Sequence, residues 1–249
     1  MTSLVKTLFL IRFFRRPACA ALALGTIGLG TIAFAPSALA ADELTVVLSK
    51  LDASSTKFKS AQADITSENT QTAPILDTDT QTGTVLFERQ NGQLQMALHL
   101  KTDNGQPAEK DVVYADGLLK FYEPLQKQVT VFKAGKNQVQ ADTILTVGFG
   151  GSGKDLQKNW DVTYAGAEKV DGKTTAKLAL VPKDAGMRNN FPKVFLWVDM
   201  DTGLALKQQF FDTSGNYRVA TYRNVKLNAS IPAKAFELKT APGTQIINR

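Results

Sequence analysis

Few residues in this sequence could support catalysis, and their spacing does not assemble a catalytic group. The single histidine, His99, lies between two leucines in an alternating segment, a pattern typical of a strand residue that faces the surface. A Ser-His-Asp triad would have to use it, yet no Gly-x-Ser-x-Gly nucleophile elbow occurs. Glu88, Glu109 and Glu123 are scattered beside polar or turn residues and define no acid–base pair. We therefore expect a protein that is not an enzyme, with a secreted hydrolase of unrecognised site as an alternative.

Two short segments resemble ligand-binding loops. Gly148 to Lys154 spells Gly-x-x-x-x-Gly-Lys, most of a phosphate-binding loop, but Asp155 follows where a serine or threonine would bind magnesium. The preceding segment also favours helix, whereas a phosphate-binding loop follows a strand. Asp199-x-Asp201-x-Gly203 begins like a calcium loop, but the later acidic ligands are missing. We interpret the first segment as a hinge or loop and the second as a hairpin turn, and we expect no cofactor and no metal.

Residues 1–40 have the organisation of a cleavable signal peptide. Basic residues precede an alanine-rich apolar stretch over 18–34, and Ala38-Leu39-Ala40 supplies the small-x-small pattern that signal peptidase accepts. The apolar stretch is short for a transmembrane helix of about 20 residues, so we favour cleavage over a retained anchor. Arg15-Arg16 resembles a twin-arginine signal, but Pro17 follows, and we favour the general export route. The sequence therefore predicts cleavage before Ala41 and one mature domain over 41–249.

The mature chain is nearly neutral and has no cysteine. The full sequence has 29 Lys and Arg against 23 Asp and Glu, and the predicted signal peptide contains four of the basic residues and none of the acidic ones. The remaining 25 against 23 give no electrostatic basis for binding nucleic acid. Cys19 lies in the signal peptide, so the mature protein has neither a disulfide nor a reactive thiol. A hydrophobic core must hold it together, which is compatible with the periplasm.

Period-two alternation dominates the mature chain and predicts about eleven short strands. The predicted strands span residues 61–67, 83–89, 94–101, 110–114, 118–122, 127–133, 160–164, 174–181, 193–199, 204–211 and 217–227. Asn-Gly and Asp-Gly pairs between them favour tight hairpins. We therefore predict a mainly β fold, a single antiparallel sheet curled into an incomplete, half-open barrel. One helix precedes it, because Leu44, Val47, Leu48 and Leu51 form one apolar stripe.

One interruption of the sheet predicts a cover. Residues 138–158 combine a short amphipathic helix, a glycine-rich run and a second helical turn. A helical insertion between two groups of strands can lie across the open face of a curved sheet. The predicted lid and hinge residues are Ile144, Leu145, Val147, Gly148, Phe149, Gly150, Gly151 and Gly153.

The parity of the strands predicts an apolar inner wall. Its residues are Val85, Phe87, Leu94, Met96, Leu98, Leu119 and Phe121. They could line a cavity or simply fill a barrel core, and the sequence does not separate these alternatives. Arg89 shares the parity of Val85 and Phe87, so its guanidinium needs acceptors or water. It either extends to water at the sheet margin or bonds to polar groups on the covering helix.

The order of several segments resembles the LolA-like family of periplasmic lipoprotein carriers, over almost all of the mature chain. The segments are Leu51–Ser55, Gly83–Arg89, Val113–Pro124 with Gln128-Val129, Gly148–Leu156, and Leu196–Asp199 with Thr202–Leu204. The resemblance implies an unclosed barrel with a helical lid over an apolar cavity. An arginine at the end of the corresponding strand bonds to the lid in that family, and Arg89 matches its place. Here Gln90 replaces the proline that usually follows, and an extra residue precedes Leu94.

The resemblance also implies a function and partners. Such proteins receive acylated lipoproteins from an inner-membrane ABC transporter and deliver them to an outer-membrane acceptor. We therefore expect a periplasmic monomer that shields the acyl chains of lipoproteins or of another long-chain lipid and binds no nucleic acid. The alternative is a periplasmic lipid- or lipoprotein-binding sensor in an envelope-stress pathway.

Overall fold

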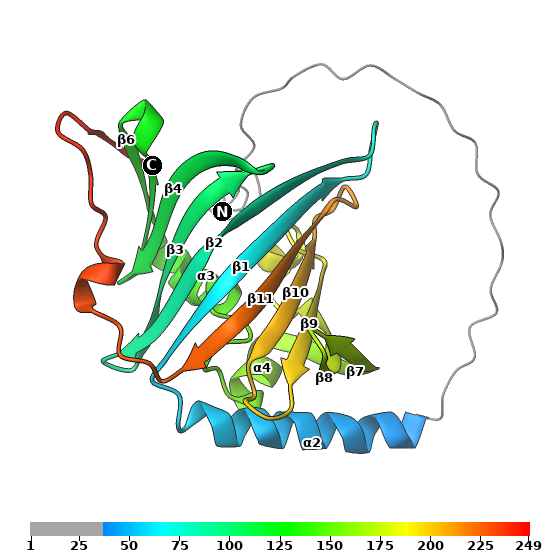
Figure 1. The fold of residues 1–249 in the computed structure, drawn as a ribbon. Helices are drawn as coiled ribbons and strands as arrows, with labels where there is room; N and C mark the ends of the chain where they lie inside the picture. The colour runs from blue at the N-terminus through cyan, green and yellow to red at the C-terminus, as the bar shows by residue number, and fades with distance from the viewer. Residues whose placement is uncertain (1–36) are drawn as a thin grey trace.

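A computed structural model describes residues 37–249, and a single sheet of twelve strands dominates it (Figure 1). Helix α2 (Ser37–Ser55) precedes the sheet, so the predicted cleavage site before Ala41 lies within this helix. Residues 1–36 of the predicted signal peptide lie outside the described residues. Within residues 37–249, no helix has the length and apolar character that crossing a membrane requires.

Most strands of the sheet pair with the strand that comes next in the sequence. Its strands are β1 (Ser60–Gln71), β2 (Asp77–Gln90), β3 (Gln93–Asp103), β4 (Gln106–Ala115), β5 (Leu118–Glu123), β6 (Gln128–Lys133), β7 (Trp160–Val170), β8 (Lys173–Pro182), β9 (Lys193–Asp199), β10 (Ala205–Phe211), β11 (Tyr217–Leu227) and β12 (Gln245–Asn248). They lie in the order β12-β6-β5-β4-β3-β2-β1-β11-β10-β9-β8-β7. Neighbours are antiparallel except for β12, which pairs in parallel with β6. Because β12 and β7 end the sheet without pairing to each other, the predicted open half-barrel is confirmed.

The hairpin turns follow from the predicted dipeptides. Asn91-Gly92, Asp116-Gly117 and Asp171-Gly172 connect neighbouring strands, and all six residues have φ between 50° and 80°. Positive φ at both central residues is the signature of the type I′ turn, whose twist matches that of a hairpin. The first hairpin is longer than predicted, because β1 and β2 pair continuously from Ser60 opposite Glu88 to Gln71 opposite Asp77.

Helices cover the concave face of the sheet (Figure 1). The apolar stripe of α2 packs against the β7–β10 half, with Val47 and Leu51 buried beside Trp160. Between β6 and β7 the chain forms α3 (Gln138–Leu145) and α4 (Gly153–Asn159), the two helical pieces predicted for the insertion. Short helices η1 (Pro124–Gln126), η2 (Gly135–Asn137), α5 (Ala185–Arg188) and η3 (Ala233–Phe236) complete the fold.

Candidate functional site

The isolated histidine lies on the convex face of the sheet. His99 Nδ1 is 2.7 Å from Asp111 Oδ1, its cross-strand partner on β4. Leu98 and Leu100, the neighbours of His99 on β3, instead line a pocket on the concave face. The His99–Asp111 pair is thus separated from that pocket by the sheet itself, as expected for a surface-facing strand residue.

The segment that resembles a phosphate-binding loop is a loop that caps the N-terminus of helix α4. It follows helix α3, and Asp155 N donates to Ser152 Oγ at 3.0 Å while Ser152 N donates to Asp155 Oδ2 at 3.3 Å. This reciprocal pair is a capping box at the start of α4. Asp155, the residue that departs from the phosphate-binding motif, therefore has a structural role at a helix N-terminus.

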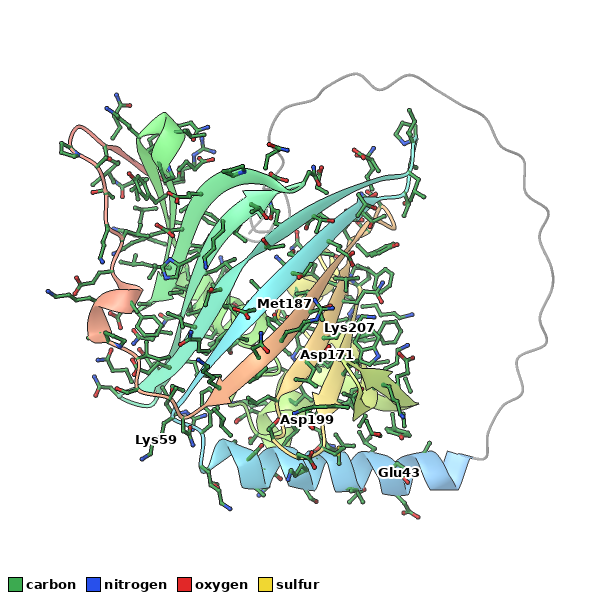
Figure 2. The ribbon with its side chains drawn as sticks, in the orientation of Figure 1. Glu43, Lys59, Asp171, Met187, Asp199 and Lys207 are labelled. Carbon is green, nitrogen blue, oxygen red and sulfur yellow. The ribbon has the colours of Figure 1, made fainter. Side chains whose placement is uncertain are left out.

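The segment that resembles a calcium loop is a turn in which the Asp199 carboxylate is hydrogen-bonded by the protein itself. It lies at the end of β9 nearest to α2 (Figure 2). The Asp199 carboxylate accepts from Asp201 N at 3.1 Å and from Lys173 Nζ and Thr202 Oγ1, both at 3.0 Å. Burial alone would raise the pKa of Asp199, but these hydrogen bonds together hold the pKa below its usual value. Across the described residues, no group of three His, Cys, Asp or Glu side chains is placed to hold a metal ion.

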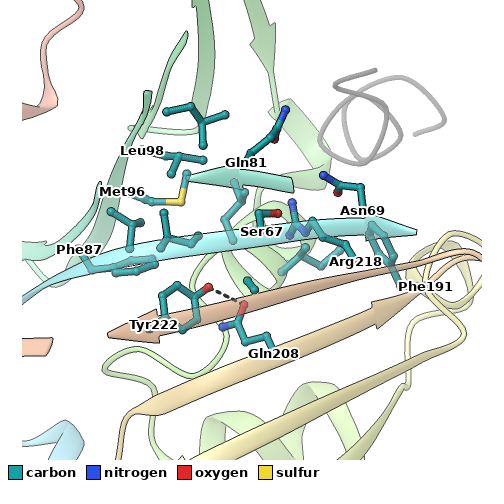
Figure 3. Close-up of a pocket in the computed structure, with 16 residues that line it drawn as sticks. Ser67, Asn69, Gln81, Phe87, Met96, Leu98, Phe191, Gln208, Arg218 and Tyr222 are labelled. Carbon is teal, nitrogen blue, oxygen red and sulfur yellow. Dashed lines mark hydrogen bonds between the residues drawn. The ribbon is translucent and has the colours of Figure 1, made fainter. Parts of the chain in front are cut away.

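A pocket lies inside the half-barrel, between the concave face and helix α3 (Figure 3). Four predicted wall residues line it, namely Val85, Phe87, Met96 and Leu98, together with the predicted lid residues Ile144 and Leu145. Its free volume is about 70 Å³. Ligand pockets commonly measure about 300–1,000 Å³, so the pocket inside the half-barrel is smaller than a typical ligand pocket.

Phe149 closes the interior from the lid side. It is fully buried and stacks on Phe87 with 4.0 Å between ring centroids and 13° between planes. Its ring also meets Tyr222 edge-on at 4.8 Å. A predicted lid residue thus occupies space inside the half-barrel, against the wall that sequence parity predicts.

Arg89 links the sheet to two segments of the cover. Its Nη1 donates to the Ser55 carbonyl at the end of α2 at 3.2 Å, and its Nη2 donates to the Gly150 carbonyl in the glycine-rich segment. The guanidinium carbon lies 5.8 Å from the ring centroid of Phe58. Arg89 Nε is buried and has no hydrogen-bond partner within residues 37–249. An unsatisfied buried donor costs about 1–3 kcal/mol. This cost reduces the net free energy by which Arg89 stabilises the closed cover.

The glycine-rich segment packs too closely for larger residues. Gly148 and Gly150 have φ of 86° and 70°. A Cβ on Gly148 would lie 2.6 Å from Ala205 Cβ, and one on Gly150 would lie 2.5 Å from Phe58 Cδ1. The Gly148 carbonyl accepts from Ala205 N at 2.9 Å. These glycines therefore allow the lid to approach β10 and Phe58, a requirement distinct from hinge flexibility.

The remaining predicted residues divide between a second pocket and the core. Leu94, Val147, Gly148, Gly150 and Gly151 line a more open pocket of about 350 Å³ beside α3 and α4. Gly153 lies where α4 crosses α2, and a Cβ there would be 2.5 Å from the Leu48 carbonyl. Leu119 and Phe121 face inward but pack in the core, with Phe121 edge-on to Phe132 at 5.8 Å.

Several polar residues of the pocket were not predicted from the sequence. Gln208 on β10 and Tyr222 on β11 form one group, in which Tyr222 Oη donates to Gln208 Oε1 at 2.9 Å (Figure 3). Gln208 Nε2 in turn donates to the Val147 carbonyl of the lid. Arg218 lies four residues before Tyr222 on β11 and faces the same side of the sheet. The alternation of Arg218, Ala220 and Tyr222 in the sequence is the signal that could have identified them.

Replacing Tyr114 by phenylalanine is expected to loosen α3 without unfolding the sheet. Tyr114 is buried on β4, and its hydroxyl donates to the Asp142 carboxylate on α3. Burial and, secondarily, this hydrogen bond raise the pKa of Tyr114. A hydrogen bond to a charged group contributes roughly 1.5–3 kcal/mol, so amide exchange in α3 should become about ten-fold faster or more. Tyr217→Phe on the convex face is the control, and unchanged exchange in α3 would show that this bond does not hold the helix.

Comparison with known proteins adds support for the fold. Residues 148–240 match a family model described as an uncharacterized protein. No curated protein matches the chain. An uncharacterized conserved protein from Thermus thermophilus superposes with a TM-score of 0.52 at 11% identity, over 83% of this chain and 99% of that one.

Two further solved structures are similar at lower TM-scores. The MucA/MucB complex of Pseudomonas aeruginosa matches with 0.45 at 18% identity, over 79% of this chain and 61% of that one. A LolA superfamily protein from Nitrosomonas europaea matches with 0.37 at 15% identity, over 78% and 96%. The chain spans 60% to 66% of the length of the MucB chains that it matches. The strand order of the structure itself confirms the open half-barrel that the sequence predicts.

Proposed function

We propose that this protein is a periplasmic carrier that shields an acyl chain inside the half-barrel and expels it when the lid closes. The observation that carries the proposal is Phe149, which lies inside the half-barrel stacked on Phe87. An apolar side chain of the lid there occupies the position that an apolar ligand would take. The closed state would therefore compete directly with ligand binding.

A bound acyl chain must offset the contacts that Phe149 loses when the lid opens. Removing the contacts of a buried phenylalanine costs about 3–5 kcal/mol, and each buried CH₂ group contributes about 0.8 kcal/mol. About four to six buried CH₂ groups therefore offset the withdrawal of Phe149. A long acyl chain exceeds this number, whereas a short one does not. The carrier would thus select long chains by free energy rather than by polar recognition of the chain.

The lid supplies a mechanism for release. Ser55 and Gly150 both present carbonyls to the Arg89 guanidinium in the closed state. Opening would break the bond to Gly150 and withdraw Phe149 together, because the two residues are adjacent. Closure would then restore both contacts and push the chain out. No step in this cycle needs a catalytic group or a cofactor.

The sequence resemblance supports a proposal for the passenger and the partners. Acylated lipoproteins are the proposed passengers, an inner-membrane ABC transporter the donor and an outer-membrane protein the acceptor. The predicted signal peptide supports a periplasmic location. Another long-chain lipid would satisfy the same apolar interior.

A cavity-filling substitution tests the proposal. Leu98→Trp should weaken binding of an apolar fluorescent dye by the delipidated mature protein, because Leu98 lines the interior pocket. Lys101→Trp is the matched control, since Lys101 is exposed on the same strand and is not among the residues that line the pocket. Titration by fluorescence measures both. Equal binding by the two variants would place the dye outside the half-barrel and contradict the proposal.

A further inference from the structure

The convex face of strands β9 to β11 carries a row of aromatic side chains. Phe195 and Trp197 on β9 alternate with residues that pack with α2, such as Leu196, so their rings lie on the opposite side of the sheet. The Phe195 ring centroid lies 6.0 Å from the centroids of both Trp197 and Phe211 of β10. The Phe211 ring in turn lies 5.7 Å from that of Tyr217 on β11. We call these four residues the aromatic row.

Three lysines lie over the aromatic row. Lys193 Nζ is 4.5 Å from the ring centroid of Phe195, and Lys207 Nζ is 4.5 Å from that of Trp197. Lys177 Nζ lies 4.8 Å from both rings. Lys193 is exposed and the other two lysines are partly exposed, whereas Trp197 is buried. The lysine side chains therefore shield the rings and place ammonium groups at the surface.

One carboxylate contacts the row. Glu168 on β7 accepts from Lys177 Nζ and from Trp197 Nε1, both at 2.6 Å. These hydrogen bonds lower the pKa of Glu168, so the carboxylate stays ionised and offsets one lysine. Within residues 37–249, Lys193 and Lys207 form no ion pair with a carboxylate. The row therefore carries an excess of positive charge.

The aromatic row has no helix over it in the described part of the chain. The helices α2, α3 and α5 pack with core residues of the concave face, and η3 packs on the convex face only over β2 to β4. Figure 1 shows β9, β10 and β11 in front, with α3 and α4 behind them. Glu68, exposed on β1 opposite Val219 of β11, marks the acidic border of this face.

We propose that the aromatic row and its lysines dock onto the anionic surface of a phospholipid bilayer. Aromatic rings favour the interfacial zone of a bilayer, and lysines are attracted to anionic headgroups. A headgroup phosphate gives each ammonium a charged partner in place of a ring face, so the lysine side chains can move aside and expose the rings to the bilayer. Rings interleaved with cations favour this occupant over an acidic polypeptide, which the lysines alone would attract. The lid lies on the opposite face, so docking does not depend on the carrier proposal.

Flotation of the mature protein with lipid vesicles tests this surface. Anionic vesicles contain equal parts of phosphatidylglycerol and phosphatidylcholine, and neutral vesicles contain phosphatidylcholine alone. We expect the wild type to bind the anionic vesicles only, and the binding to weaken as salt rises. Each lysine near an anionic surface raises partitioning about five-fold, so Lys193→Gln combined with Lys207→Gln should lower it about twenty-five-fold. Phe211→Ser should also weaken binding, at unchanged charge, because it removes a ring from the row.

Lys154→Gln combined with Lys158→Gln is the matched control. Both lysines are exposed on α4, so this pair removes the same charge away from the aromatic row, and vesicle binding should match the wild type. Equal losses from the two pairs would reduce the effect to net charge and overturn the proposal. Equal binding of the wild type to both kinds of vesicle, or to neither, would also overturn it. An unchanged affinity of Phe211→Ser would exclude contact between the rings and the bilayer.

Two further measurements keep the outcome decisive. Binding of the wild type to soluble polyglutamate but not to anionic vesicles would assign the surface to an acidic protein partner and overturn the membrane proposal. If the double lysine variant does not fold, the single change Lys193→Gln at an exposed position should still lower partitioning about five-fold. Acyl-ligand binding inside the half-barrel is titrated separately, so failure of either proposal leaves the other standing.

Discussion

Replacing Arg89 by leucine should leave the sheet folded but slow the release of a bound acyl chain by about ten-fold or more. The guanidinium bonds to carbonyls of two cover segments, Ser55 and Gly150. The bond to Gly150, which opening breaks, contributes roughly 1.5–3 kcal/mol to the closed state. Leucine keeps an apolar side chain near Phe58 but provides no donor. Because closure and ligand binding compete, a weaker closed state raises the apparent affinity of the protein for its ligand.

The measurement is the rate at which a fluorescent acyl ligand leaves the protein for excess acceptor vesicles. Arg89→Lys should be intermediate, since one ammonium group cannot reproduce the paired donors. Far-UV circular dichroism should match the wild type, and the melting temperature should fall by no more than about 10 °C. Release at the wild-type rate would exclude Arg89 as a latch, and loss of the folded state would make it a structural residue.

Phe149→Ala should produce the largest effect on the interior. Phe149 is fully buried between Phe87 and Tyr222, and a buried phenylalanine contributes about 3–5 kcal/mol. If the lid opens as a unit, losing this free energy destabilises the closed state of the lid and leaves the sheet as stable as before. The variant should therefore bind long acyl chains at least about a hundred-fold more tightly, the minimum expected from that energy. Amide exchange in α3 and the glycine-rich segment should also accelerate.

Phe236→Ala provides the control for Phe149→Ala. Phe236 is buried on the convex face against Leu86 and Ala97, away from the interior pocket. Its loss should lower the melting temperature without changing ligand affinity. If Phe149→Ala instead lowers global stability as Phe236→Ala does and leaves affinity unchanged, then Phe149 is an ordinary core residue and the lid does not open.

The sequence predicts the sheet well because hairpins are local. Asn91-Gly92 and Asp171-Gly172 determine turns, and alternation then assigns each flanking residue to a face. The same parity places Arg89 beside Phe87 on the concave face, where the structure shows its bonds to Ser55 and Gly150. The helical insertion is also visible, since its 3.6-residue period interrupts a period of two.

Long-range packing accounts for what the sequence does not predict. β12 is a four-residue strand that pairs in parallel with β6, far away in sequence. Leu119 and Phe121 have the inward parity of a wall, but Phe132 packs against Phe121 and removes it from the pocket. Phe149 lies in a glycine-rich run without periodicity, so no pattern indicates that it enters the half-barrel. Arg218 was missed because a charged residue in a strand is usually read as facing solvent.

Photo-crosslinking of a bound acyl ligand locates its chain within the protein. A hexadecanoyl ligand with a diazirine at the end of its chain is bound to the mature protein and activated by light, and the modified residues are mapped by mass spectrometry. We expect adducts on the concave wall near Met96 and Leu98, suppressed by excess unlabelled ligand and increased in Phe149→Ala. Adducts confined to the convex face, or an unchanged pattern in Phe149→Ala, would contradict an acyl chain that takes the place of Phe149.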